Sequence, residues 1–257
     1  MKKNDLIDAI KKNEIWLTLG INDIKMRYRR SVVGPLWITL SMAIFCFTLG
    51  IIYSKLFNSN IRELLPFLSI GLITWTYISG FLGEAPNLYV DNANYIKDIK
   101  INLFSINLRS LIRHAIIFLH NFIILILILI YFDLSIKWCV LLFPIGFLLI
   151  TINLLNFGVI LSLIGARFRD LMQIVQNTLQ LIFFITPIFW FPRLLPEGSL
   201  IVEANPVSHL LNLVRMPLLG EVPGINSWLI GCVTFTASFY FAIYLYKKKS
   251  SKVVFWI

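Results

Sequence analysis

Long apolar runs dominate the chain, and short polar stretches separate them. A helix of about 20 residues spans the roughly 30 Å of hydrocarbon in a bilayer. All but one of the runs fit that length, and the fourth, with 28 residues, is expected to tilt or to project past the membrane. The six runs cover about residues 36–57, 65–83, 114–132, 138–165, 174–192 and 227–246. The pattern predicts an all-α polytopic membrane protein with six transmembrane helices.

The composition agrees with a membrane protein. The chain has 257 residues, of which 58% are hydrophobic and 14% charged, and its mean hydropathy is +0.80. A soluble domain is about half apolar and a quarter charged, so the soluble classes are excluded. Lys2 and Lys3 are not followed by an apolar core at signal-peptide distance, so no cleaved signal is expected. Three cysteines lie far apart, without the spacing of a metal site or a disulfide framework: Cys46, Cys139 and Cys232.

The basic residues are divided unequally between the two sides of the membrane. Six spans place both chain ends on one side, and 18 of the 23 lysines and arginines lie on that side. The positive-inside rule therefore predicts that both termini of this multi-pass protein are cytoplasmic. The full net charge of +10 falls on this side. Anionic lipid headgroups are a sufficient partner for it, and no nucleic acid is expected.

Two polar segments precede the first apolar run. Residues 4–19 and 22–30 place apolar side chains at helical spacing among charged ones, which predicts amphipathic helices on the inner leaflet. Gly34-Pro35 then breaks the chain and turns it into the bilayer. A simple charged anchor is the alternative for the whole segment 1–35.

Two connections between the runs have unusual composition. The cytoplasmic stretch 86–110 is the largest polar one, and it either docks a soluble partner or forms a solvated turn. On the outer side, 193–226 carries two apolar pieces that are each too short to span, around Leu200–Val202 and Leu210–Leu218. Such pieces predict a re-entrant helical hairpin. A lid packed on its own bundle is the alternative.

Motifs of catalysis are missing from the sequence. It has no G-x-x-x-x-G-K-[ST] phosphate loop, no G-x-S-x-G elbow and no His-Glu-x-x-His zinc motif. The histidines have no metal spacing and are expected to pack or to donate hydrogen bonds: His114, His120 and His209. Glu84 is the carboxylate nearest the bilayer, either a functional residue or an interfacial one. No cofactor or metal is expected in this chain.

Polar amides and aromatic rings recur within the apolar runs. The amides either join helices by hydrogen bonds or line a pore: Asn153, Asn156, Gln176, Asn177 and Gln180. Rings beside hydroxyl groups suit the C–H faces and hydroxyl edges of sugars, and helix packing or lipid contact is the alternative for each ring. The aromatic residues predicted to line a channel are Trp37, Phe45, Tyr53, Trp75, Tyr77, Phe81, Phe184 and Trp190.

Four elements of the sequence resemble the polysaccharide-exporting type-2 ABC transporter permeases. The stretch DIKMRYRRSVVGPLW at 23–37 resembles their D-[IL]-K-x-R-Y-x-x-S-x-L-G-x-x-W entrance, with Val33 in place of the usual Leu. ARFRDL at 166–171, TPIFW at 186–190 and NPV at 205–207 are similar to three further family elements, in the same order. The resemblance covers essentially the whole chain. It is strongest to the O-antigen exporter permeases called Wzm, with teichoic-acid and capsule exporters as relatives.

The resemblance implies a single permease domain (1–257) that forms a homodimer around a channel, paired with two copies of a separate ATPase subunit. ATP and Mg²⁺ would bind that partner, so this chain is not expected to be an enzyme. Its parts would be a cytoplasmic amphipathic segment with an interface helix (1–35), spans one to five (36–192), a re-entrant periplasmic gate (193–226), and span six with a cytoplasmic tail (227–257).

The resemblance also implies a cargo, a polysaccharide on an undecaprenyl diphosphate carrier. Arginine suits phosphate geometry, and the residues that could meet the diphosphate are Arg27, Arg29, Arg30, Arg167 and Arg169. For each of these arginines the alternative role is to set the orientation of the chain in the membrane or to dock the ATPase. A coupling helix that meets the ATPase would contain Asp91, Asn94, Tyr95, Lys97 and Asp98.

The resemblance therefore predicts export of lipid-linked O-antigen across the bacterial inner membrane, with capsule or teichoic-acid export as the alternative. Within transport, a drug or small-lipid exporter is the other rival. A rival of another class is an integral-membrane glycosyl- or acyltransferase acting on the same lipid. Such an enzyme needs a convergent acid, base or metal site, and the scarcity of His, Asp and Glu within the apolar runs opposes it.

Overall fold

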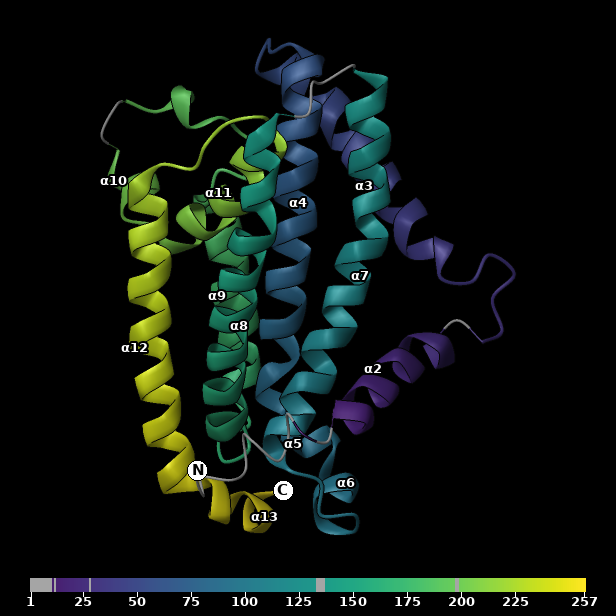
Figure 1. Ribbon diagram of the computed structural model, residues 1–257, viewed down its shortest axis with the longest axis vertical. Coiled ribbons are helices and arrows are strands. Elements are labelled where there is room, and N and C mark those ends of the chain that lie inside the picture. Colours follow the sequence, from purple (N-terminus) through teal and green to yellow (C-terminus); the bar gives the residue numbers. More distant parts are fainter. Residues whose placement is uncertain (1–10, 12, 28, 133–136, 197–198) are drawn as a thin grey trace.

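The computed structural model describes residues 11, 13–27, 29–132, 137–196 and 199–257. Throughout this described part every regular element is a helix and no strand occurs, so the all-α prediction is confirmed. The long helices lie side by side along the long axis of the molecule (Figure 1). They are α3 (Leu36–Leu56), α4 (Ile61–Glu84), α7 (Leu103–Tyr131), α8 (Phe143–Gly165) and α12 (Ile225–Lys249).

Five helical segments are long and apolar enough to cross a membrane. They are Leu36–Leu56, Ile61–Asp91, Leu103–Tyr131, Trp138–Gly165 and Ile225–Trp256. The third begins at Leu103 instead of at residue 114, so the arginines that precede the apolar run belong to the helix. These segments account for five of the six predicted spans.

The predicted fifth span, 174–192, is not one continuous helix. The helix α9 (Leu171–Ile185) has 15 residues, which corresponds to about 22 Å. It stops because Thr186 precedes a proline, which disfavours the helical region, and Thr186 adopts an extended conformation with φ −82° and ψ 135°. The chain continues without regular helix to the short 3-10 turn η3 (Pro192–Leu194).

The helix α4 forms the centre of the bundle. Almost every side chain from Leu64 to Ile78 is buried, whereas α3 and α12 expose most of their apolar side chains. The core around α4 is aromatic, with Tyr77 stacked on Phe147 and tilted against Phe118. Exposed apolar faces on α3 and α12 are what lipid contact requires.

Short helices occupy the two ends of the bundle. One end holds η1 (Ala85–Asn87), α5 (Leu88–Asp91), α6 (Ala93–Lys97), η4 (Ser250–Lys252) and α13 (Val253–Trp256) (Figure 1, bottom). We call it the basic end, because the lysines of α6, α12 and η4 lie there. The opposite end holds η2 (Trp138–Leu142), α10 (Leu200–Glu203) and α11 (Pro206–Leu218). The apolar face of α11 packs against α4, α8 and α12.

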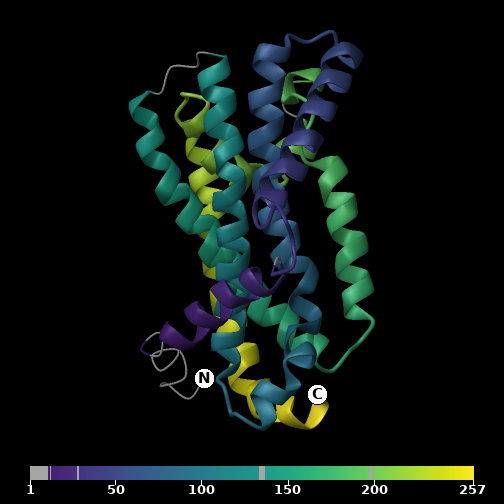
Figure 2. The same cartoon turned by 90° about the vertical axis from the view of Figure 1, so that its right-hand side faces the viewer.

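The N-terminal segment contains one described helix, α2 (Asn13–Arg27), in place of the two predicted ones. Most of residues 4–12 lie outside the described part of the chain. The helix slants across the basic end and packs against α7 (Figure 2). Gly34, with φ +62°, then turns the chain into α3, as its sequence predicts. The cysteines are free; Cys46 and Cys139 are buried and Cys232 is exposed on α12.

Candidate functional site

A cluster of charged side chains joins α2 to α7 at the basic end. Arg109 donates two hydrogen bonds to the carboxylate of Asp23, from Nε at 2.8 Å and from Nη2 at 2.6 Å. Arg113 lies one turn further along α7, with its Nη1 3.6 Å from the same carboxylate. Both arginines and Asp23 are only 18% exposed. Bidentate contacts of this kind are among the strongest that proteins form.

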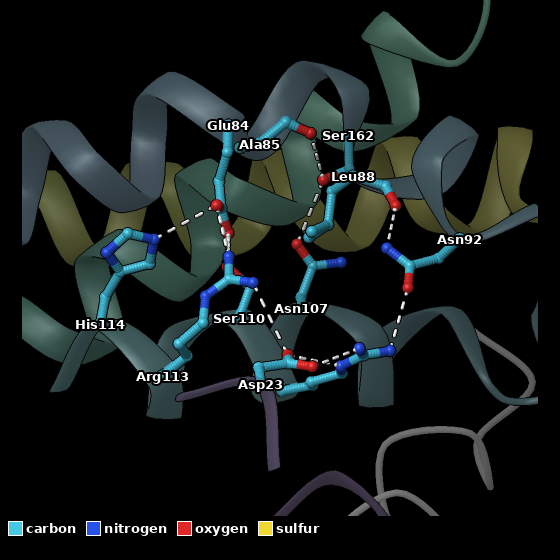
Figure 3. Close-up of polar contacts among 11 residues, drawn as sticks. Asp23, Glu84, Ala85, Leu88, Asn92, Asn107, Ser110, Arg113, His114 and Ser162 are labelled. Atoms are coloured by element: carbon cyan, nitrogen blue, oxygen red, sulfur yellow. Dashed lines mark hydrogen bonds and ion pairs between the residues drawn. The ribbon is translucent and has the colours of Figure 1, made fainter. Parts of the chain in front are cut away.

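Glu84 attaches the last turn of α4 to the same cluster. Arg113 donates to both oxygens of the Glu84 carboxylate, and Ser110 donates to one of them. His114 places Nε2 3.3 Å from the other oxygen (Figure 3). A carboxylate at the C-terminal end of a helix is disfavoured by the helix dipole, so these partners from α7 compensate for its position. Glu84 is therefore paired and is not a free intramembrane carboxylate.

Arg109 also contacts the connection between α5 and α6. Its Nη1 donates to Oδ1 of Asn92 at 3.1 Å, and the amide of Asn92 donates to the Leu88 carbonyl at 2.8 Å. The guanidinium carbon of Arg109 lies 5.1 Å from the centre of the Tyr95 ring. Arg109 thus binds α2 on one side and the α5–α6 connection on the other.

A second, uncharged set of contacts ties this connection to α8. Asn107 donates to the Tyr89 hydroxyl at 2.7 Å, and Ser162 donates to the Ala85 carbonyl at 2.8 Å and to Oδ1 of Asn107 at 3.2 Å. Gly165 ends α8 so close to Pro86 that a Cβ there would lie 2.1 Å from the Pro86 carbonyl oxygen. The segment from η1 to α6 is therefore fixed to three helices.

This arrangement can transmit force, since four elements meet through short, charge-assisted contacts. We call Asp23, Glu84, Asn92, Arg109 and Arg113 the arginine cluster. Any displacement of the α5–α6 connection must move Arg109, and with it α2 and α7. In the part of the chain that the structure describes, no three His, Cys, Asp or Glu side chains are grouped to hold a metal ion.

A second feature lies on α9, which exposes a polar face. Gln173, Asn177 and Gln180 recur every three or four residues on the exposed surface, and Gln176 is exposed beside them. Phe184 extends the same face towards the opposite end. Within this face, hereafter the amide face, Gln173 donates to Asn177 at 3.1 Å. The other exposed face of α9 is apolar, with Ile174, Leu181 and Ile185.

The amide prediction is confirmed for α8 and not for α9. Asn153 donates to the Gly231 carbonyl at 3.2 Å and Asn156 donates to the Ser238 hydroxyl at 3.1 Å, so both join α8 to α12. The amides of α9 are exposed instead. Amide groups facing hydrocarbon are costly, so the amide face requires water or a protein partner.

A third feature, at the opposite end, is a buried arginine on α11. Arg215 is 1% exposed and donates from Nη1 to the Pro187 carbonyl at 2.8 Å. Its guanidinium lies 3.9 Å from the centre of the Phe67 ring, and its Nε and Nη2 have no partner among the described residues. Burial lowers the pKa of this guanidinium, because desolvation disfavours its charged form.

Comparison with known proteins gives the family. The model of the ABC-2 type transporter family matches residues 15–219. The chain belongs to the ABC-2 type transporter family. Two proteins of Klebsiella pneumoniae named "O-antigen export system permease protein RfbA" are each 26% identical over 203 residues, which is 77% of either chain. A Myxococcus xanthus protein of the same name is 24% identical over 198 residues, 76% of either chain.

The predicted phosphate-binding arginines of this ABC-2 chain form two exposed groups. Arg27, Arg29 and Arg30 lie at and after the end of α2. Arg167 and Arg169 lie in the turn between α8 and α9, where the Arg167 guanidinium is 5.6 Å from the centre of the Trp256 ring. Their exposure leaves all five accessible to a ligand.

The predicted coupling residues of this ABC-2 chain lie on the segment that the arginine cluster holds. Asp91, Asn94, Lys97 and Asp98 are exposed, whereas Tyr95 is half-buried against Arg109. Ile96 between them is buried in an apolar cluster with Leu103 and Val253. The segment therefore presents polar side chains outward and is anchored by apolar and aromatic ones.

The predicted channel aromatics of this ABC-2 chain divide by burial. Trp37, Phe45 and Phe184 are exposed. Tyr53 and Trp190 are half-buried, with Tyr53 stacked between Phe57 and Phe189. The remaining three are buried on α4 inside the bundle: Trp75, Tyr77 and Phe81. The Tyr77 hydroxyl is hydrogen-bonded to Thr151 at 3.0 Å.

Sequence reasoning missed Arg109, Arg113 and Asn92 as functional candidates. The spacing of Arg109 and Arg113, four residues apart, places them on one face of a helix. The sequence contains this spacing. It was not used because the apolar run begins only at residue 114, whereas α7 starts at Leu103. Sequence reasoning also missed Arg215, although it interrupts the apolar piece around Leu210–Leu218.

Proposed function

We propose that this ABC-2 chain is the transmembrane permease subunit of an ATP-driven exporter of lipid-linked O-antigen. The family and the names of the relatives support the class of cargo. The observation that carries the proposal is the amide face of α9, since a polar surface on a membrane helix needs water or protein beside it, and a transport path provides water. Such a water-filled path is suited to a hydrated polysaccharide as cargo.

The proposed topology has six crossings and cytoplasmic termini. The helix α9 and the extended segment 186–191 together would make the fifth crossing, because irregular backbone is tolerated at depth where it lines protein or water. The lysines and arginines of the basic end favour the cytoplasm. In this orientation α2 is the interface helix, and α10 and α11 form the periplasmic gate.

The position of the amide face supports a homodimer. The face lies on the outside of one chain, so a second wall is needed to keep lipid away from Gln173, Asn177 and Gln180. A second copy supplies an identical wall across a twofold axis. The exposed aromatics Trp37, Phe45 and Phe184 would then contribute to a channel on which sugar rings slide, without the tight site that would trap a polymer.

The ATPase is proposed to dock on the segment from η1 to α6. A separate subunit, present twice, would push on the exposed Asp91, Asn94, Lys97 and Asp98. The arginine cluster would pass this movement to α2 and α7. The exposed arginines after α2 and those in the turn between α8 and α9 would meet the diphosphate of the undecaprenyl carrier.

The experiment replaces the amide face by an apolar one. In cells that lack the native permease gene, the Asn177→Leu, Gln180→Leu double variant should lower surface O-antigen by about tenfold, because an apolar stripe no longer holds water. Surface polysaccharide is measured on gels. The control is Thr236→Leu, which makes an exposed polar residue of α12 apolar and should leave export unchanged.

ATP hydrolysis by the purified complex serves as the second measurement. It should persist in the double variant, because hydrolysis belongs to the other subunit. Unchanged surface polysaccharide in the double variant would exclude α9 from the pathway. Loss of a capsule or of a teichoic acid in place of O-antigen would assign the other cargo class.

A further inference from the structure

An apolar cavity lies between α7, α8 and α12, in the half of the bundle nearer the basic end. Its volume is about 230 Å³. Its lining comes from Phe104 and Leu108 on α7, Ile152 and Val159 on α8, and Phe239 and Ala242 on α12, among others. The polar groups at its edge are already used, since Asn156 donates to Ser238 and Tyr246 donates to Asn102. The cavity therefore selects an apolar ligand.

The shape of this cavity suits a hydrocarbon chain. An apolar cavity of about 150 Å³ already holds a molecule such as benzene, so this one has room for a run of methylene groups. It lies between three membrane-crossing helices, where the surrounding solvent is lipid. The apolar groups of a lipid bilayer are acyl chains, so an acyl chain is the ligand that we expect in this cavity.

A second, larger cleft, with a mixed apolar and charged lining, begins where the apolar cavity ends. The two share Tyr246, and the cleft of about 1450 Å³ extends between α2, the residues around Lys100 and the end of α12. Its charged lining residues are Lys97, Lys100, Lys247 and Glu14. Lys97 donates to the Ile257 carbonyl, whereas Lys100 and Lys247 are exposed and make no ion pair within the described part of the chain. Two lysines without an ion pair, against the single carboxylate of Glu14, favour an anion.

We propose that this cavity and cleft together bind one anionic phospholipid. An acyl chain occupies the apolar cavity, and the phosphate lies between Lys100 and Lys247. Lysines at the end of a membrane helix are suited to anionic headgroups. The bound lipid spans from α12 to the segment after α6 and to α2, and α2 is also held by the arginine cluster. The site lies away from the amide face of α9 and does not depend on the transport cargo.

The experiment measures phospholipid retained by the purified chain. Protein exchanged into detergent with an equal mixture of phosphatidylglycerol and phosphatidylcholine is washed, and its bound lipid is measured by mass spectrometry. We expect phosphatidylglycerol to be retained in preference, and the Lys100→Gln, Lys247→Gln variant to reduce it about tenfold, since two cations that favour an anionic headgroup are removed. Lys55→Gln, an exposed lysine near the opposite end, is the matched control and should retain it.

A second variant tests the acyl chain. Ile152→Trp fills the cavity from α8 and should also abolish retention, whereas Leu148→Trp, on an exposed part of the same helix, should not. Equal retention of both phospholipids by the wild-type chain, or unchanged retention in both test variants, would overturn the proposal. Retention of a polyprenyl diphosphate in place of phospholipid would overturn it too. If the wild-type chain retains no lipid and Ile152→Trp loses its dimer, the cavity is covered by a second copy of the chain. That result would also overturn the proposal.

Discussion

Single residues at the two ends of the bundle have opposite electrostatic surroundings. Arg109 is neutralised by a carboxylate on another helix, whereas Arg215 is buried with only a carbonyl and an aromatic ring. Desolvating an unpaired guanidinium costs several kcal/mol. Its charged hydrogen bond returns about 1.5–3 kcal/mol and the ring contact roughly 2 kcal/mol. Because Nε and Nη2 of Arg215 also lack partners, its charge is not expected to add net stability.

The Arg215→Met variant separates these roles. Its melting temperature should lie within a few degrees of the wild-type value, while export falls because α11 loses its hydrogen bond to the Pro187 carbonyl. Thermal unfolding in detergent and surface polysaccharide are the two measurements. Arg215→Ala, which leaves a cavity, should melt earlier. A large fall in melting temperature for Arg215→Met with normal export would assign Arg215 to stability alone.

Asp23 and Arg109 are expected to act as a pair. Asp23→Ala leaves Arg109 without its carboxylate and should reduce export, and Arg109→Ala should do the same. The double variant should lose less than the sum of the two single losses, because the interaction can be removed only once. Export measured across this double-mutant cycle gives the coupling. Lys25→Ala, exposed on α2, is the control, and additive losses in the cycle would contradict a functional pair.

At the scale of elements, close backbone packing holds the segment from η1 to α6. Gly165→Val would drive a side chain into the Pro86 carbonyl and displace that segment. Export should fall and ATP hydrolysis by the complex should no longer respond to the permease. Gly83→Ala is the matched control, since its new Cβ would meet only Leu179 at an ordinary 3.7 Å. Normal coupling in Gly165→Val would show that this contact is dispensable.

The elements also show which features the sequence predicts well. Apolar runs of helical length predicted α3 and α12 closely, because burial in lipid depends on composition alone. Arg109 and Arg113 allow the helix of the third apolar run to begin before residue 114, and α7 does begin earlier, at Leu103. The end of α9 at Thr186 was missed, although the residue before a proline is a known helix boundary. The pairing of Asp23 with Arg109 could not be predicted, since it depends on how two distant helices pack.

At the scale of the whole molecule, the two ends of the bundle differ in charge and in partners. The basic end carries the arginine cluster and the exposed lysines of α12, and the opposite end carries α10 and α11. Because the two ends differ in charge, the orientation of the chain in the membrane can be predicted, and one membrane-impermeant reagent tests it.

Labelling of single cysteines measures that orientation. In a variant with the native cysteines replaced by serine, Glu221→Cys should react with a membrane-impermeant maleimide added to cells with a permeable outer membrane. Lys248→Cys should react only after the inner membrane is opened, because the positive-inside rule places it in the cytoplasm. Labelling in the reverse order would invert the topology and remove the basis for ATPase docking at the basic end.

The distribution of the cysteines has a practical consequence for spectroscopy. Since Cys46 and Cys139 are shielded and Cys232 points out of the bundle, a lipid-soluble spin label would attach to the unmodified chain at one place. Two such labels in a homodimer would report the separation of the two α12 helices before and after nucleotide is added. The resting and driven states could then be compared in the native sequence.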